Sequence, residues 1–104
     1  MPVISIACYR PKEGMENELV ELVMVHHPLL RSQELVTDRP PTLMRADDGT
    51  ILEVFGWIGA EEKDMAHENE KVLKLWNRFG EISESVPLTD LAEAKYKYAN
   101  FEPL

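Results

Sequence analysis

A chain of 104 residues with 44% hydrophobic and 29% charged side chains has the length and composition of one globular domain, which excludes a disordered tail. Its formal net charge of -8 repels phosphate backbones and anionic lipid headgroups, so neither nucleic acid nor a membrane is expected as a partner. No apolar run reaches the ~20 residues of a membrane-spanning helix. The first residues lack the basic stretch of a secretory signal, so a cytoplasmic location is expected.

The first predicted elements are a strand over residues 3–10 and a helix over residues 14–27. β-branched residues are dense in the strand, and Pro11 should end it. Side chains that recur at three- and four-residue steps predict one buried face of the helix: Met15, Leu19, Leu22, Val23 and His26. Pro28 is expected to bend or interrupt this helix before one further turn.

Residues 42–46 and 51–58 predict two strands that are joined by a turn at Gly49. Alternation along the second strand should place two sets of side chains on opposite faces of the sheet. One set comprises Ile51, Glu53, Phe55 and Trp57, and the other comprises Leu52, Val54, Gly56 and Ile58. Neither face is polar enough for contact with water.

A second helical stretch follows Gly59, with a break at Asn69 and an end near Pro87. A last strand is predicted over residues 94–101. The resulting order, β-α-β-β-α-β, is the ferredoxin-like arrangement of an α+β fold, with both helices on one side of an antiparallel sheet. Residues 1–104 thus form one domain. Because its first and third strands are apolar on both faces, a second copy should cover the other side, in a homodimer that buries on the order of 2,000 Å².

Three segments resemble the antibiotic-biosynthesis-monooxygenase-like (ABM-like) group of the dimeric α+β barrel superfamily: DGTILEVFGW at 48–57, AHEN at 66–69 and VLKLW at 72–76. Nearly the whole chain fits that pattern. The resemblance implies a dimer whose two sheets face each other, with a ligand cavity between sheet and helices in each protomer. The superfamily includes cofactor-free monooxygenases, haem-degrading enzymes and isomerases, so the resemblance indicates a fold more than a reaction.

The haem-degrading branch of that superfamily differs from this chain at its active positions. It carries an asparagine in the first strand, and a tryptophan and a histidine ten residues apart on the second long helix. The first strand here has Ile6, Ala7 and Cys8 instead, and the comparable helical positions are His67 and Asn77. Haem is therefore not expected, nor is any other cofactor.

Proton transfer near neutral pH points first to histidine. His67, about one turn into the second helical stretch, could point into the cavity as a catalytic base, or it could be a capping or surface side chain. Glu53 shares a strand face with Trp57, and a carboxylate among aromatic rings could also act as a base. Arg45 on the neighbouring strand could instead pair with Glu53, which would make both residues structural.

Several further residues could bind a substrate. Phe55, Trp57 and Trp76 could form the flat apolar walls of an aromatic pocket, or they could belong to the core. His26 could be a buried, hydrogen-bonded side chain or could line the cavity. Since the neighbouring side chain of His27 diverges from it on a helix, no metal site is expected. Three hydroxyl groups are further candidates: those of Tyr9, Tyr96 and Tyr98.

Pro2 supports a competing hypothesis. If Met1 is removed, a proline amine at the start of a strand resembles the tautomerase superfamily, where that amine is the catalytic base. This resemblance covers residues 1–6 only.

The leading expectation is a cofactor-independent, monooxygenase-like enzyme that acts on a small hydrophobic or aromatic substrate. His67 or Glu53 would remove a proton beside Trp57, and the substrate would be bound by His26, Arg45, Phe55 and Trp76. Two alternatives stay open: a non-catalytic small-molecule-binding or interaction dimer, and an isomerase or tautomerase that uses Pro2.

Overall fold

The computed structural model describes residues 1–104 and contains five strands and three α-helices. In chain order these elements are β1 (Val3–Pro11), α1 (Glu16–Ser32), β2 (Thr42–Arg45), β3 (Ile51–Trp57), α2 (Ala60–Ala66), α3 (Glu70–Ile82), β4 (Ser83–Ser85) and β5 (Glu102–Pro103). Two short 3-10 turns, η1 (Leu88–Asp90) and η2 (Ala92–Lys95), separate the last two strands. No helix is long and apolar enough to cross a bilayer.

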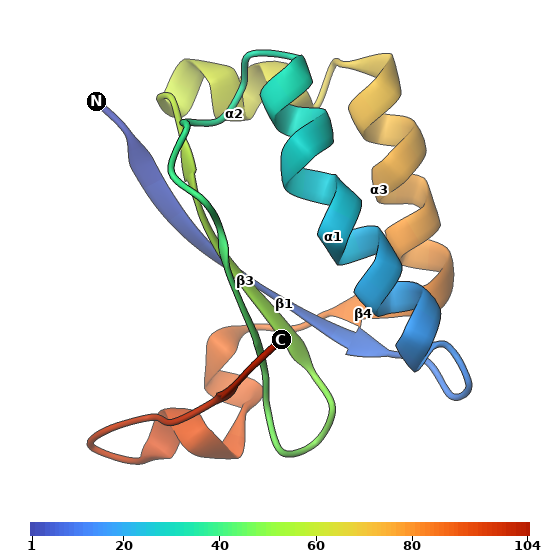
Figure 1. Cartoon of the computed structure of the whole chain (residues 1–104), viewed down its shortest axis with the longest axis vertical. Helices are drawn as coiled ribbons and strands as arrows, with labels where there is room; N and C mark the ends of the chain where they lie inside the picture. The colour runs from blue at the N-terminus through green and yellow to red at the C-terminus, as the bar shows by residue number, and fades with distance from the viewer.

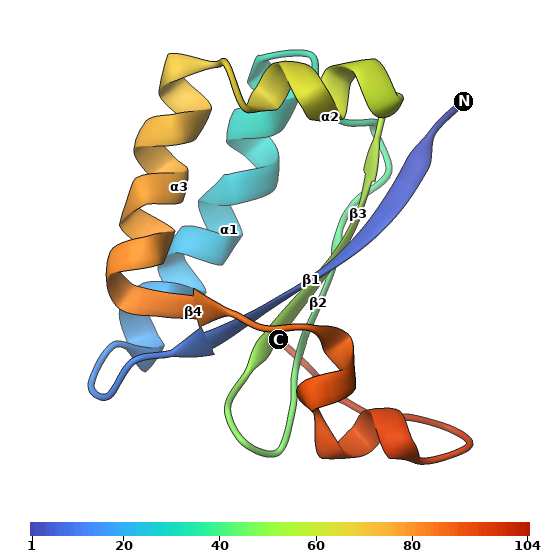
Figure 2. The same ribbon diagram turned by 180° about the vertical axis from the view of Figure 1, so that it is seen from behind.

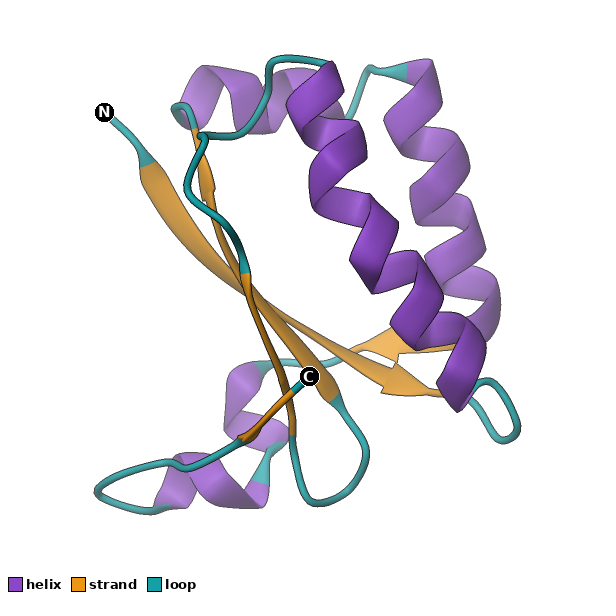
Figure 3. Ribbon diagram, viewed as in Figure 1, coloured by secondary structure: helices purple, strands orange, loops and turns teal.

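The strands form one antiparallel sheet in the order β4-β1-β3-β2-β5 (Figures 1 and 3). The long central pair, β1 and β3, is in register from Val3 opposite Trp57 to Tyr9 opposite Ile51. The tight β2–β3 turn is made possible by Gly49, whose φ of 92° lies in the left-handed region that favours glycine. The predicted α+β class is therefore confirmed.

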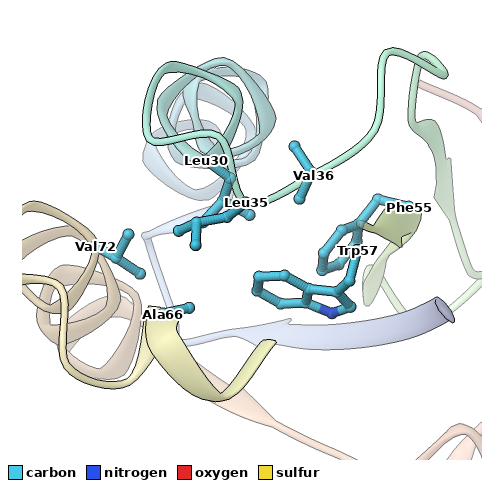
Figure 4. Close-up of a cluster of buried hydrophobic side chains, with 7 residues drawn as sticks. All are labelled: Leu30, Leu35, Val36, Phe55, Trp57, Ala66 and Val72. Atoms are coloured by element: carbon cyan, nitrogen blue, oxygen red, sulfur yellow. The ribbon is translucent and has the colours of Figure 1, made fainter. Parts of the chain in front are cut away.

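Helices α1 and α3 run side by side against one face of the sheet, and α2 lies across one end of it (Figures 1 and 2). The side chains of β3 that were predicted to share a face all point toward the helices. Figure 4 shows Phe55 and Trp57 in the cluster that closes this layer at the α2 end, with Leu30 from α1, Ala66 from α2 and Val72 from α3. A second cluster, around Leu19, Val23, Ile51 and Phe79, fills the opposite end.

The other face of the sheet is only half covered. The segment after β4 folds across it, and Leu91 is fully buried against Cys8 and Leu52. This part of the face is thus shielded by the chain itself, which the sequence did not predict. Ile4 and Ile6, toward the start of β1, remain about half exposed, at 52% and 51%.

Two predicted elements differ from the structure. Helix α1 continues through Pro28 to Ser32 without interruption. Its last turn is held against the core by Leu30, which is fully buried. The strand predicted over residues 94–101 is wrong: this segment begins in η2 and continues as a loop. The positions beside β1 and β2, where a last strand could have paired, are taken by the short strands β4 and β5.

The predicted break at Asn69 is confirmed. It separates α2 from α3, and the Asn69 side chain caps α3 by accepting hydrogen bonds from the backbone N–H groups of Lys71 and Val72.

Candidate functional site

A cavity of about 390 Å³ lies on the helix side of the sheet. Its walls are mainly aromatic and its lining comes from β1, α1, β3, α2, α3 and β4. The lining residues are Ser5, Ala7, Tyr9, His26, Phe55, Trp57, Lys63, Trp76, Phe79, Gly80 and Ser85. The size and the apolar walls suit a small organic ligand.

A buried hydrogen-bond network borders this cavity. The His26 Nδ1 atom lies 2.8 Å from Glu53 Oε1 and 3.0 Å from Oε2. The Tyr9 hydroxyl donates to the same Oε1 over 2.9 Å. Glu53 is 0% exposed and His26 is 2% exposed, so both partners are removed from water. The carboxylate therefore depends on these two protein donors.

Trp76 fixes the protonation pattern of the imidazole. Its indole Nε1–H lies 2.9 Å from His26 Nε2, and an indole nitrogen can only donate. His26 Nε2 must then be the acceptor, so the ring proton is on Nδ1 and is donated to Glu53. This arrangement gives the imidazole a defined tautomer, with Nδ1 facing the Glu53 carboxylate and Nε2 facing the indole.

Four elements position this network: β1 carries Tyr9, α1 carries His26, β3 carries Glu53 and α3 carries Trp76. His26 lies on the α1 face of Leu19, Val23 and Leu30, which are all buried. Glu53 occupies the centre of β3 on the helix side, and the Phe55 ring two residues further along meets the His26 imidazole in a T-shaped contact with centroids 5.7 Å apart. On the α3 side, the wall of the cavity is formed by Trp76, Phe79 and Gly80.

Tyr9 is held between the carboxylate and an aromatic ring. Its own ring stacks on Phe79 with centroids 4.8 Å apart. Burial, followed by the nearby Glu53 carboxylate that accepts its hydrogen bond, holds the pKa of the Tyr9 hydroxyl well above its ordinary value of 10. Tyr9 therefore keeps its proton and acts as a fixed donor to Glu53.

The structure places His67 outside the cavity lining. It is exposed at the C-terminal end of α2, and its ring meets that of Trp76 edge-on with centroids 5.0 Å apart. His67 thus touches the tryptophan that donates to His26, and it is separated from the buried network by that indole.

The expected pairing of Arg45 with Glu53 does not form, so that structural alternative is wrong. The β2–β3 register sets Arg45 opposite Ile51 and sets Leu43 opposite Glu53. Arg45 does not line the cavity, whereas Phe55, Trp57 and Trp76 all do. In Figure 4 the Trp57 indole nitrogen is turned away from the aliphatic side chains, and it donates to Ser5 Oγ over 3.1 Å.

The remaining candidates lie elsewhere. Pro2 is exposed and borders a separate hollow with Asp38 and Arg39. Tyr96 and Tyr98 are exposed in the segment that follows η2. No group of three His, Cys, Asp or Glu side chains is arranged to hold a metal ion.

His27 is buried beside His26 but is in a different environment. Its Nε2 atom has no hydrogen-bond partner. Burial lowers the pKa of this imidazole from its ordinary value of 6.5. His27 does not line the cavity and has no place in the network.

Sequence reasoning missed the pairing of His26 with Glu53 and the role of Tyr9 as its third member. A signal for the pairing was present, because each is a polar side chain on an otherwise apolar helix stripe or strand face. Two buried polar groups in one small domain are expected to satisfy each other.

No protein-family model, curated protein or solved structure matches this chain. What the site can do therefore follows from its own geometry.

Proposed function

We propose that this protein is a cofactor-independent, monooxygenase-like enzyme in which His26 takes a proton from a small hydrophobic or aromatic substrate. The observation that carries this proposal is the Glu53–His26 pair at the wall of an aromatic cavity. A carboxylate that fixes one ring nitrogen of a histidine leaves the other as a proton acceptor, which is the arrangement of a general base.

The indole of Trp76 occupies that acceptor before a substrate arrives. An imidazolium would carry a proton on each ring nitrogen, and its Nε2–H would face the indole N–H, donor against donor. Proton uptake by His26 therefore requires that the indole move aside. A substrate that displaces it presents its own acidic hydrogen to Nε2, and the resulting imidazolium is stabilised by the Glu53 carboxylate.

The reaction proposed for the substrate carbanion is with molecular oxygen. Overall, a methylene group and O₂ give a carbonyl group and water, so the substrate carbon loses four electrons and one molecule of O₂ takes them up. One oxygen atom enters the carbonyl group and the other leaves as water with both methylene hydrogens. The aromatic walls around Phe55 and Trp57 would keep bulk water from the carbanion.

The finer description of the fold belongs to the same proposal. A ferredoxin-like protomer is supported by the order of the elements up to β4 and by the strand order β4-β1-β3-β2. A homodimer of the dimeric α+β barrel kind is supported by the half-exposed Ile4 and Ile6 on the sheet face that the helices leave open.

A non-catalytic ligand-binding dimer is the second candidate. It is favoured by one observation: the hydrogen bonds of Tyr9, His26, Glu53 and Trp76 are all made inside the chain. A network that needs nothing from a ligand could serve stability alone.

Turnover on anthrone-like and hydroquinone-like compounds, with and without air, separates the two candidates. We expect oxygen uptake with the wild type and a loss of about 10²-fold or more in kcat with His26→Gln. His67→Ala, which leaves the network intact, should have a smaller effect. If His26→Gln retains the wild-type rate, or if no compound is turned over, the catalytic proposal fails and the ligand-binding candidate takes its place.

A further inference from the structure

The cavity carries polar groups that the His26 network does not use. Two of them, Ser5 and Lys63, lie where Trp57 and α2 close one end of it. Ser5 is on β1 opposite Phe55, and Lys63 is in the middle of α2. The polar groups at this end decide which functional group a bound ring can carry there.

Both of these groups are free to donate. Ser5 Oγ accepts the indole hydrogen of Trp57, and its own hydroxyl hydrogen is given to no partner in the chain. Lys63 takes part in no ion pair or side-chain hydrogen bond, although the chain has 19 acidic residues and a net charge of -8. An ammonium group offers three donors and no acceptor.

No carboxylate competes for these donors inside the cavity. None of the lining residues is acidic. Glu53 is fully buried behind His26 and already accepts from His26 and Tyr9. Among the lining residues, the α2 end of the cavity therefore presents the Lys63 ammonium and the Ser5 hydroxyl as donors, and the chemical complement of these two groups is an anionic acceptor group.

We propose that the cavity selects aromatic carboxylates, with the ring between Trp57 and Trp76 and the carboxylate oxygens bound by the Lys63 ammonium and the Ser5 hydroxyl. This inference rests on the proposed function, in that the same molecule would meet His26. It adds the charge and the orientation of the ligand. Trp57 acts as a positioning residue: because its indole N–H donates to Ser5 Oγ, the serine hydroxyl hydrogen points away from the indole and is available to a ligand carboxylate.

Binding of 3-phenylpropionate and of its neutral isostere 3-phenylpropionamide tests the proposal. Both tryptophans of the chain line the cavity, so quenching of fluorescence excited at the red edge of tryptophan absorption reports occupancy directly. Calorimetry gives the two dissociation constants independently. We expect the carboxylate to bind about tenfold more tightly than the amide, the usual effect of a charge-assisted hydrogen bond.

Lys63→Gln should remove this preference, because it weakens the binding of the carboxylate and leaves the binding of the amide unchanged. Ser5→Ala should make the same preference smaller. Lys74→Gln is the matched control: Lys74 is an exposed lysine on α3 that borders a different hollow, between α1 and α3. This variant changes the net charge equally and should keep the preference. Because Lys63 is exposed on α2, its substitution should leave the fold intact.

The outcomes distinguish this inference from the function on which it rests. Equal binding of acid and amide, or a preference that survives Lys63→Gln, overturns the charge selection and leaves proton transfer by His26 standing. If neither compound binds at millimolar concentration, the cavity is not a site for aromatic ligands, and both proposals fall.

Discussion

Replacing His26 with leucine should show how strongly the buried Glu53 carboxylate depends on the imidazole. Leucine has a similar volume and no polar atom. The carboxylate, 0% exposed, would lose a hydrogen bond to a charged group, and the Trp76 indole would lose its acceptor. At about 2 kcal/mol for the first and about 1 kcal/mol for the second, the free energy of unfolding should fall by about 3 kcal/mol.

The double variant carries the decisive comparison. Glu53→Leu alone leaves the His26 Nδ1–H and the Tyr9 hydroxyl without an acceptor, a loss of about 2 kcal/mol. In the double variant, the buried Glu53 carboxylate that His26→Leu leaves without its imidazole partner is no longer present. The double variant should therefore be no less stable than His26→Leu, with a coupling energy of about 2 kcal/mol or more.

Urea unfolding followed by far-UV circular dichroism measures all four proteins, at one protein concentration because a dimer would make stability concentration-dependent. The surface pair of Arg10 and Asp48, 3.6 Å apart and 39% and 48% exposed, provides a control cycle whose coupling should stay below about 1 kcal/mol. Additive effects at His26 and Glu53, within about 0.5 kcal/mol, would refute the network as the reason for their burial.

Four further predictions concern stability and assembly. Because burial lowers the pKa of His27 below its ordinary 6.5, the unfolded chain binds more protons than the folded one near and below that pH. The free energy of unfolding should thus fall on acidification, and His27→Leu should flatten this slope in urea titrations; an unchanged slope would contradict it. Pro28→Ala restores a backbone N–H inside α1 and should stabilise the chain by about 1 kcal/mol, seen as a raised Tm rather than a lowered one. Asn69→Ala removes the cap of α3 and should lower stability by about 1 kcal/mol in thermal melts, and no change would mean that the cap is dispensable. In sedimentation velocity the wild type should be a dimer and Ile6→Lys a folded monomer, and a monomeric wild type would end the dimer proposal.

The central part of the fold could be predicted because its patterns are local. The alternation along residues 51–58 determines which side chains of β3 face the helices, and Gly49 marks the turn that it must make. The last strand failed for the opposite reason. Which segment pairs with β1 and β2 is decided by contacts far apart in the sequence, and the structure gives these positions to β4 and β5, strands of only three and two residues.

The candidate site was predictable as a set of faces but not as a set of contacts. Periodicity put His26 on the buried stripe and Glu53 on the inner strand face, yet their partners depend on strand register and on how the two helices pack. Arg45 misses Glu53 because the hairpin sets it two residues further along, opposite Ile51. His26 and His27, adjacent in sequence, differ in the same way: Trp76 and Glu53 satisfy the first, and nothing satisfies Nε2 of the second.

The position of the network bears on why the chain keeps it. Buried polar groups that serve stability alone can often be replaced by apolar side chains of the same volume without loss, and such groups need no cavity beside them. Here the carboxylate lies in the dry interior, while His26 and Tyr9, which bond to it, both line the cavity wall. The hydrogen bond from the Trp76 indole, which also lines the cavity, is made at the imidazole nitrogen that would receive a proton. A network built only for the core would have no reason to direct that nitrogen toward the wall, so the geometry favours proton exchange with a ligand over a purely structural role.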